Sequence, residues 1–169
     1  DATLVRNPAM GYIGTVSHDH PFNAFKEVAE RSGIKVYHIN PWSQPISFED
    51  NIRIMKESYC APDFRSHGDA AQVQKHGRMN GTNHLDIGYI PCRVFKAISY
   101  GQTGITNSPR VKELLGEYVE YTSDPAEVIP IVRRREKDVA WRQECMKYVA
   151  ENHTFLQRAR DLARALKMK

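Results

Sequence analysis

The sequence predicts an α/β fold in which helices cover both faces of a parallel sheet. Short runs of β-branched and aromatic residues alternate with segments whose apolar residues recur at helical spacing. The strand-like runs are short and apolar and alternate with helices, which is typical of a parallel sheet covered on both faces. The 169 residues form one domain with a sizeable core, and no internal repeat suggests a solenoid.

The first third of the chain provides two strands and two helices. We expect a strand at 12–16 and a helix that opens at Pro21 and ends at Gly33, followed by an alternating strand at 34–39. Ser47 is a suitable N-cap for the second helix. The apolar residues expected on the buried face of this second helix are Phe48, Ile52, Met55 and Tyr59.

The middle of the chain is less regular. Residues 59–62 form a short apolar segment closed by a proline, and we expect a third strand there. Residues 65–86 are polar and contain three glycines, so they predict a loop with at most a helical turn near 70–76.

A helix is expected at 91–100, with Pro91 in its first turn and Gly101 as its left-handed stop. A buried strand follows at 103–106. Free backbone N–H groups and the positive dipole end at such a helix start favour an anion, and Arg93 and Lys96 add two cations. The alternative is an ordinary helix with two solvated basic residues.

The last part of the chain continues the alternation. A short helix opens at Ser108 and Pro109 and ends at Gly116, and residues 118–121 read as a strand. Asp124 opens a further helix, which Pro130 is expected to kink or restart.

Two closing helices are expected within 136–169. Trp141, Cys145, Tyr148 and Val149 define one face of the first. Thr154 and Gln157 form a capping box for the second. The apolar stripe of this last helix is Phe155, Ala159, Leu162, Ala163 and Leu166, which should pack on this domain or cross toward a partner.

Two groups of residues resemble the donor-binding half of GT-B glycosyltransferases, in particular the group-1-like family that includes spore-maturation-type proteins. The first group, Pro91, Arg93, Phe95 and Gly101, matches a helix of the type Pro-x-Arg-x-Phe-Glu-x-x-x-x-Gly. The second group matches a His-Thr-aromatic-x-x-Arg helix and consists of His153, Thr154, Phe155 and Arg158. The resemblance implies a Rossmann-like sheet that forms one half of a GT-B fold.

The resemblance also implies a donor site at the carboxyl edge of the sheet. It would place Asp63 and Phe64 near the base, and Arg65 and Lys75 near the phosphates. The expected donor-binding residues are Gly14, Asp63, Phe64, Arg65, Lys75, Tyr89, Ile90, Arg93 and Lys96. Lys96 stands where the family has a glutamate that faces the ribose, so recognition of the ribose by a glutamate pair does not carry over. No catalytic residue is assigned.

Several other classes lack their motifs. Gly11 and Gly14 do not form a dinucleotide fingerprint, and neither a nucleoside-triphosphate-binding loop nor a hydrolase nucleophile elbow occurs. The seven histidines show no ligand spacing, so we expect no metal, which fits the metal independence that the GT-B resemblance implies. No other cofactor is expected, because the nucleotide sugar would be the substrate. No apolar run is long enough to span a membrane. Cys60, Cys92 and Cys145 read as reduced core cysteines of a cytoplasmic protein.

The sequence therefore predicts a nucleotide-sugar-binding domain of a glycosyltransferase. It is expected to be a single domain (1–169) excised from a longer chain, and to be inactive without an N-terminal acceptor domain. The alternative is a non-enzymatic α/β binding or scaffold module that has lost donor binding, which Lys96 supports. Nucleic-acid binding through the arginine-rich last helix is a weaker option: the net charge is +4, but no nucleic-acid-binding motif accompanies it.

Overall fold

The computed structural model describes residues 9–13, 21–40, 43–65, 85 and 88–166. In chain order its elements are β1 (Ala9–Ile13), α1 (Pro21–Arg31), β2 (Lys35–Ile39), α2 (Phe48–Glu57), α4 (Cys92–Ser99), β3 (Ile105–Thr106), α5 (Pro109–Leu115), the 3-10 turn η1 (Gly116–Tyr118), β4 (Glu120–Tyr121), α6 (Pro125–Lys137), α7 (Val139–Asn152) and α8 (Phe155–Ala165). The α/β class predicted from the sequence is confirmed.

The strands are short and parallel. β1 pairs with β2, and β3 pairs with β4, so that two small sheets form. The segment that follows α2, residues 60–63 (the central segment), joins the two sheets through isolated parallel bridges. Cys60 bridges to Met10 of β1, and Asp63 bridges to Thr106 of β3. The resulting order across the molecule is β2, β1, central segment, β3, β4.

This order contains a reversal. From β1 the chain passes to β2 on one side, whereas from the central segment it passes to β3 on the other side. Open parallel sheets bind ligands beyond the carboxyl ends of their strands at such a reversal. The carboxyl end of the central segment is therefore the place to look for a site.

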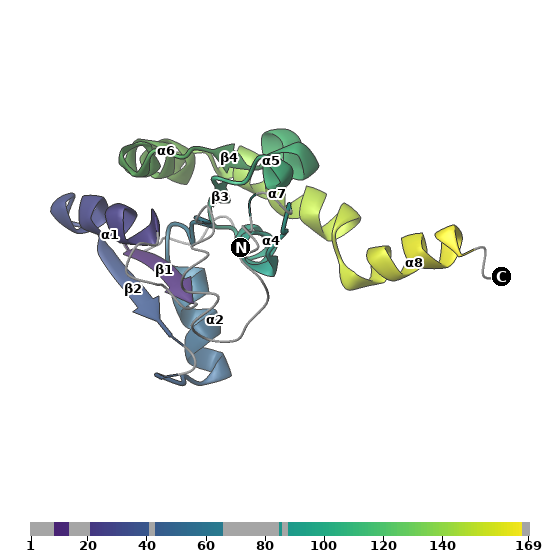
Figure 1. Cartoon of the computed structure of the whole chain (residues 1–169), viewed down its shortest axis with the longest axis horizontal. Coiled ribbons are helices and arrows are strands. Elements are labelled where there is room, and N and C mark those ends of the chain that lie inside the picture. The colour runs from purple at the N-terminus through teal and green to yellow at the C-terminus, as the bar shows by residue number, and fades with distance from the viewer. Residues whose placement is uncertain (1–8, 14–20, 41–42, 66–84, 86–87, 167–169) are drawn as a thin grey trace.

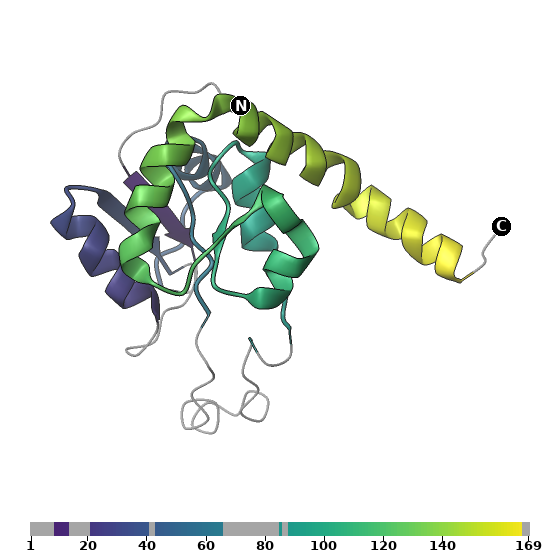
Figure 2. The ribbon, with the colours of Figure 1, turned by 90° about the horizontal axis from the view of Figure 1, so that it is seen from above.

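Helices cover the strands on both faces, and each face has its own apolar core. α1 and α6 lie side by side over one face (Figures 1 and 2), where Phe22, Phe25 and Val132 are fully buried. α4, α5 and α7 bury the second core, which includes Ile98 and Leu115. Each such side chain stabilises the fold by about 1.5–3 kcal/mol relative to its exposed form.

Local capping chemistry sets the starts of four helices. The side chains of Ser47, Ser108, Asp124 and Thr154 each accept a hydrogen bond from a backbone N–H of the following first turn, as the sequence predicts. Gly101 follows α4 with a φ of 78°, which confirms the left-handed stop.

Some boundaries differ from the prediction. β1 begins at Ala9, three residues before the expected start of that strand, and Pro91 is the N-cap of α4 and does not lie in its first turn. α6 runs through Pro130 as one helix and does not restart there. Residues 14–20 and 66–84, which include the expected loop with its helical turn, lie outside the described residues.

The buried face of α2 also differs from the prediction. Phe48 is 73% exposed, and Ile54, outside the predicted stripe, is the buried residue of the helix. The reason is contact with β1: a Cβ on Gly11 would lie 2.9 Å from Cγ2 of Ile54, so the missing side chain lets α2 approach the strand on its Ile54 face.

α8 leads away from the rest of the molecule to the C-terminus (Figures 1 and 2) and has no buried residue. From the sequence, the apolar stripe of α8 was expected either to pack on this domain or to cross toward a partner. The first of these arrangements is not observed. Among the described helices, none combines the length and apolar content needed to cross a bilayer.

Candidate functional site

The centre of the candidate site is Asp63, whose carboxylate is fully buried at the end of the central segment. Its Oδ1 lies 2.8 Å from Nη2 of Arg65 and 3.6 Å from Nη1 of Arg93. The hydroxyl of Thr106, on the neighbouring β3, donates to Oδ2 at 3.4 Å. One carboxylate is thus shared by two guanidinium groups, and the three charges sum to +1.

Arg65 is held at both its backbone and its side chain. The side-chain amide of Asn107, just after β3, accepts from Arg65 N and donates to Arg65 O, both at 2.8 Å. The guanidinium lies 5.2 Å from the centre of the Tyr89 ring. Because the backbone, the carboxylate and the ring each fix it, the Arg65 fork is preorganised, and its side chain remains 14% exposed.

Arg93 reaches the same carboxylate from the first turn of α4, with its side chain 19% exposed. Arg65 lies two residues after the central segment, and Arg93 lies on a helix 28 residues further along the chain. Both side chains retain some solvent contact, although Nε of Arg65 and Nη1 of Arg93 are themselves buried. Forked, partly desolvated arginines next to a helix N-terminus are well suited to bind phosphate or carboxylate.

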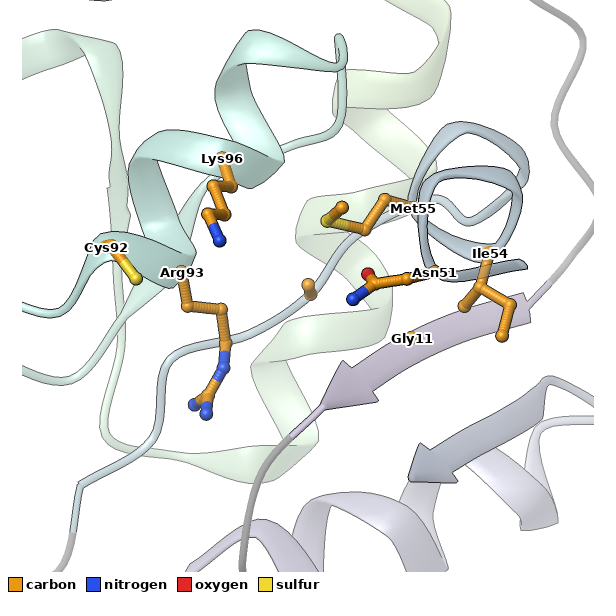
Figure 3. A pocket seen from close by; sticks show the side chains of 8 residues that line it. Gly11, Asn51, Ile54, Met55, Cys92, Arg93 and Lys96 are labelled. Carbon is orange, nitrogen blue, oxygen red and sulfur yellow. The ribbon is translucent and has the colours of Figure 1, made fainter. Parts of the chain in front are cut away.

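A cavity of about 140 Å³ lies between α2 and α4, over β1 (Figure 3). Asn51 and Met55 of α2 point into this space from one side, and Arg93 and Lys96 of α4 from the other. Gly11 forms part of its floor. The cavity is mainly apolar, and the two charged residues among its described lining are both cations.

The three cysteines divide into two kinds. Cys92, at the rim of this cavity, is exposed, which corrects the prediction that all three are core residues. Burial raises the pKa of the Cys60 thiol far above its usual range. Burial likewise raises the pKa of Cys145 to about 12, mainly by desolvation. Cys92 is therefore the accessible thiol of the three.

The structure brings together only some of the predicted donor-binding residues. Asp63, Arg65, Tyr89 and Arg93 cluster at the carboxyl edge, and Lys96 lines the adjoining cavity. Asp63 is turned inward to the two arginines and has no exposed surface, so it orients them and does not face a base.

Two other predicted residues have structural positions. Phe64 is fully buried against Phe25, so its ring belongs to the core and offers no face to a ligand. Ile90 is partly buried and packs against the core formed by α4, α5 and α7. Gly14 and Lys75 lie outside the described residues.

Sequence reasoning missed Asn107, Asn51 and Met55. Asn107 follows a predicted buried strand, and polar residues at such strand ends are the usual signal for a site at the sheet edge. Asn51 and Met55 carry no such signal, because only the packing of α2 on Gly11 brings them to the cavity.

Comparison with known proteins gives no further guide. No protein-family model, no curated protein and no solved structure matches this chain significantly. The function must therefore be argued from the site itself.

The arginine run of α6, residues 133–135, does not form a second site among the described residues. Of the three consecutive arginines, Arg134 and Arg135 pair with Glu120 of β4. Burial would raise the pKa of this carboxyl, but the hydrogen bonds from Arg135 and Arg134 outweigh that effect and lower it. No described group of three or more His, Cys, Asp or Glu residues could hold a metal ion.

Proposed function

We propose that this chain is the donor-binding domain of a metal-independent glycosyltransferase that holds a nucleoside diphosphate-sugar. The observation that carries the proposal is the pair of guanidinium groups of Arg65 and Arg93, oriented by the buried carboxylate of Asp63 at the reversal in strand order. The resemblance of Pro91, Arg93, Phe95 and Gly101 to the GT-B donor helix agrees with this location.

The chemistry of glycosyl transfer explains why such a pair is useful. The sugar leaves a diphosphate on which negative charge develops, and fixed cations that meet this charge lower the barrier. In many enzymes a metal ion supplies that charge. Here Arg65 and Arg93 would supply it, and Asp63 would keep them in place without reorganisation during the reaction.

The role of Tyr89 follows from its position. Its ring is 45% exposed, and one side of it faces the Arg65 guanidinium. An exposed aromatic ring at the edge of a diphosphate site can stack on a nucleobase. Tyr89 would thus take the place that the resemblance assigned to Phe64, whose ring is buried.

The proposed reaction needs a second domain. The proposed donor-binding arginines lie at the carboxyl edge, but no acceptor-side base can be assigned among the described residues. A cleft between two domains would also exclude water, which otherwise hydrolyses a bound donor. We infer that an N-terminal acceptor domain completes the enzyme and that α8, with its exposed apolar stripe, contacts it.

A thermal-shift screen against UDP, GDP, CDP and ADP tests the proposal. A ligand at one hundred times its dissociation constant should stabilise the domain by about 2.7 kcal/mol. A rise in the melting temperature with one of the four is the expected result. Unchanged melting with all four above millimolar concentration would contradict donor binding.

Such a negative result would favour the second candidate, a binding or scaffold module of the same fold that has lost donor binding. The specific observation in its favour is Lys96, which stands where the resembling family places a glutamate.

A further inference from the structure

The cavity between α2 and α4 adjoins the arginine pair through Arg93, which belongs to both. An apolar cavity of about 150 Å³ can hold one benzene molecule. At about 140 Å³, this cavity is about the size of one six-membered ring, and the substituents and phosphate of a sugar would extend out of it on the side of Arg93 and the exposed Lys96.

The two cations that line the cavity, Arg93 and Lys96, favour a ring that carries negative charge. Arg93 and Lys96 are one helical turn apart on the same side of α4, and both line the side of the cavity opposite Asn51 and Met55 of α2 (Figure 3). Arg93 already lies beside the carboxylate of Asp63, whereas Lys96 is exposed and has no described carboxylate beside it in the lining of the cavity. A ring that carries an acidic group would meet Lys96 while its phosphate meets Arg93.

Asn51 adds a second requirement. Its side-chain oxygen is buried, lines the cavity, and receives no hydrogen bond from the part of the chain that the structure describes. A buried acceptor without a donor is costly, and a hydroxyl group of a ligand would satisfy it. The walls supplied by Ile54 and Met55 suit the apolar face of a ring.

We propose that this cavity holds the sugar ring of the donor and that Lys96 selects a sugar acid, such as a hexuronate, over the neutral sugar. This inference rests on the proposed function, in which the arginine pair holds the diphosphate. It names the substrate class: a nucleoside diphosphate-sugar whose sugar carries a carboxylate.

The test uses glucose 1-phosphate and glucuronic acid 1-phosphate, which lack a base and differ only at carbon 6. Titration calorimetry on the full chain is expected to give about fivefold to tenfold tighter binding of the acid. This expected ratio is intermediate: a fully desolvated charge-assisted contact would strengthen binding by more than about tenfold, and a fully exposed ion pair would strengthen it by less than about fivefold. The preference should weaken as salt is raised.

Cys92 supplies an independent readout. Iodoacetamide should label this thiol while Cys60 and Cys145 stay unlabelled, and the bound acid should slow the labelling because Cys92 lies at the rim of the cavity. Lys96→Met should abolish the preference for the acid. The matched control is Lys56→Met, which removes an exposed lysine of α2 outside the cavity and should keep the preference.

Equal binding of the two sugar phosphates, or binding of neither with no protection of Cys92, would overturn the inference. A preference that survives Lys96→Met would overturn the role of Lys96. If the chain binds a nucleoside diphosphate but binds the two sugar phosphates equally, this inference fails and the proposed function stands. If the chain prefers glucuronic acid 1-phosphate but binds no nucleoside diphosphate, the cavity does select an acid and the proposed function fails.

Discussion

Asn107 clamps the backbone of Arg65. Its side chain accepts from Arg65 N and donates to Arg65 O, both at 2.8 Å, across 42 residues of sequence. The clamp joins the residue that follows β3 to a residue just after the central segment, at the point where the arginine pair forms, so the geometry of the site depends on it.

Replacing Asn107 should therefore damage both stability and binding. Asn107→Ala leaves two polar backbone groups of Arg65 without partners, at a cost of about 1–3 kcal/mol for each group that stays buried. Urea unfolding measures the loss. Asn107→Asp, which keeps the acceptor but removes the donor, should fall between wild type and the alanine variant. An alanine variant as stable as wild type would show that the clamp carries no energy.

Arg142 of α7 is a buried cation away from the candidate site, with only 2% of its surface exposed. It donates to the carbonyl oxygen of Gly101 at 3.1 Å and to that of Glu136 at 2.9 Å, and so joins the ends of α4 and α6 to α7. Arg142→Met should reduce the free energy of unfolding by about 3 kcal/mol. The control Arg133→Met, at an exposed position of α6, should change it by less than about 0.5 kcal/mol.

His153, at the junction of α7 and α8, should make stability depend on pH. Its ring lies 5.3 Å from the rings of Phe95 and Tyr148, and burial, with a smaller contribution from Arg158, lowers its pKa. The unfolded chain then binds more protons, so stability is full above the unfolded pKa of about 6.5 and declines as pH falls below it.

Urea unfolding between pH 7 and pH 5 measures this decline, because the lowered carboxyl pKa values of Asp50 and Glu120 act only at lower pH. His153→Phe should unfold with a flatter pH dependence than wild type. An identical decline in the two proteins would contradict the role of His153.

We expect α8 to contribute to contact with the proposed acceptor domain and not to the stability of this domain. Phe155 is 89% exposed, and Leu162 and Leu166 are each 60% exposed, an apolar stripe of the kind that marks a contact surface. Deleting residues 155–169 should change the free energy of unfolding by less than about 1 kcal/mol.

If the chain is joined to the proposed acceptor domain, Leu162→Asp should reduce sugar transfer, whereas Arg160→Asp on the polar side of α8 should not. This chain alone should transfer no sugar. Robust transfer by the chain alone, or loss of its fold on deletion of α8, would contradict this view of the helix.

The sequence predicted the features that depend on local chemistry. Ser47, Ser108 and Thr154 cap helices because a short side chain can reach the N–H groups of the next turn wherever the helix packs. The α/β class was also predictable, because the spacing of apolar residues within each short segment distinguishes strands from helices. The similarity to a GT-B half remains a proposal.

The parts that escaped prediction depend on contacts between distant segments. Phe48 belongs to a regular apolar stripe, yet Ile54 is buried because α2 meets a strand glycine. Arg65 and Arg93 could each be singled out from the sequence. Their convergence on Asp63 could not, because it depends on the parallel bridges of the central segment.

The placement of Arg93 also bears on stability. Its side chain is only 19% exposed and lies beside the buried Asp63. Its removal should cost about 1–3 kcal/mol, because that carboxylate loses one of the two cations that the structure describes beside it. Binding measurements on its variants therefore need a check of folding by circular dichroism.

The most direct test of the arginine pair as a diphosphate site is calorimetric titration of nucleoside diphosphates into wild type, Arg93→Ala and Arg53→Ala. Arg53 is an exposed arginine of α2 and serves as the control. Wild type and Arg53→Ala should bind one of the nucleotides with micromolar to millimolar affinity. Folded Arg93→Ala should bind it at least tenfold more weakly, a loss of about 1.4 kcal/mol or more. Equal affinity of all three proteins, or no binding by wild type, would contradict the account.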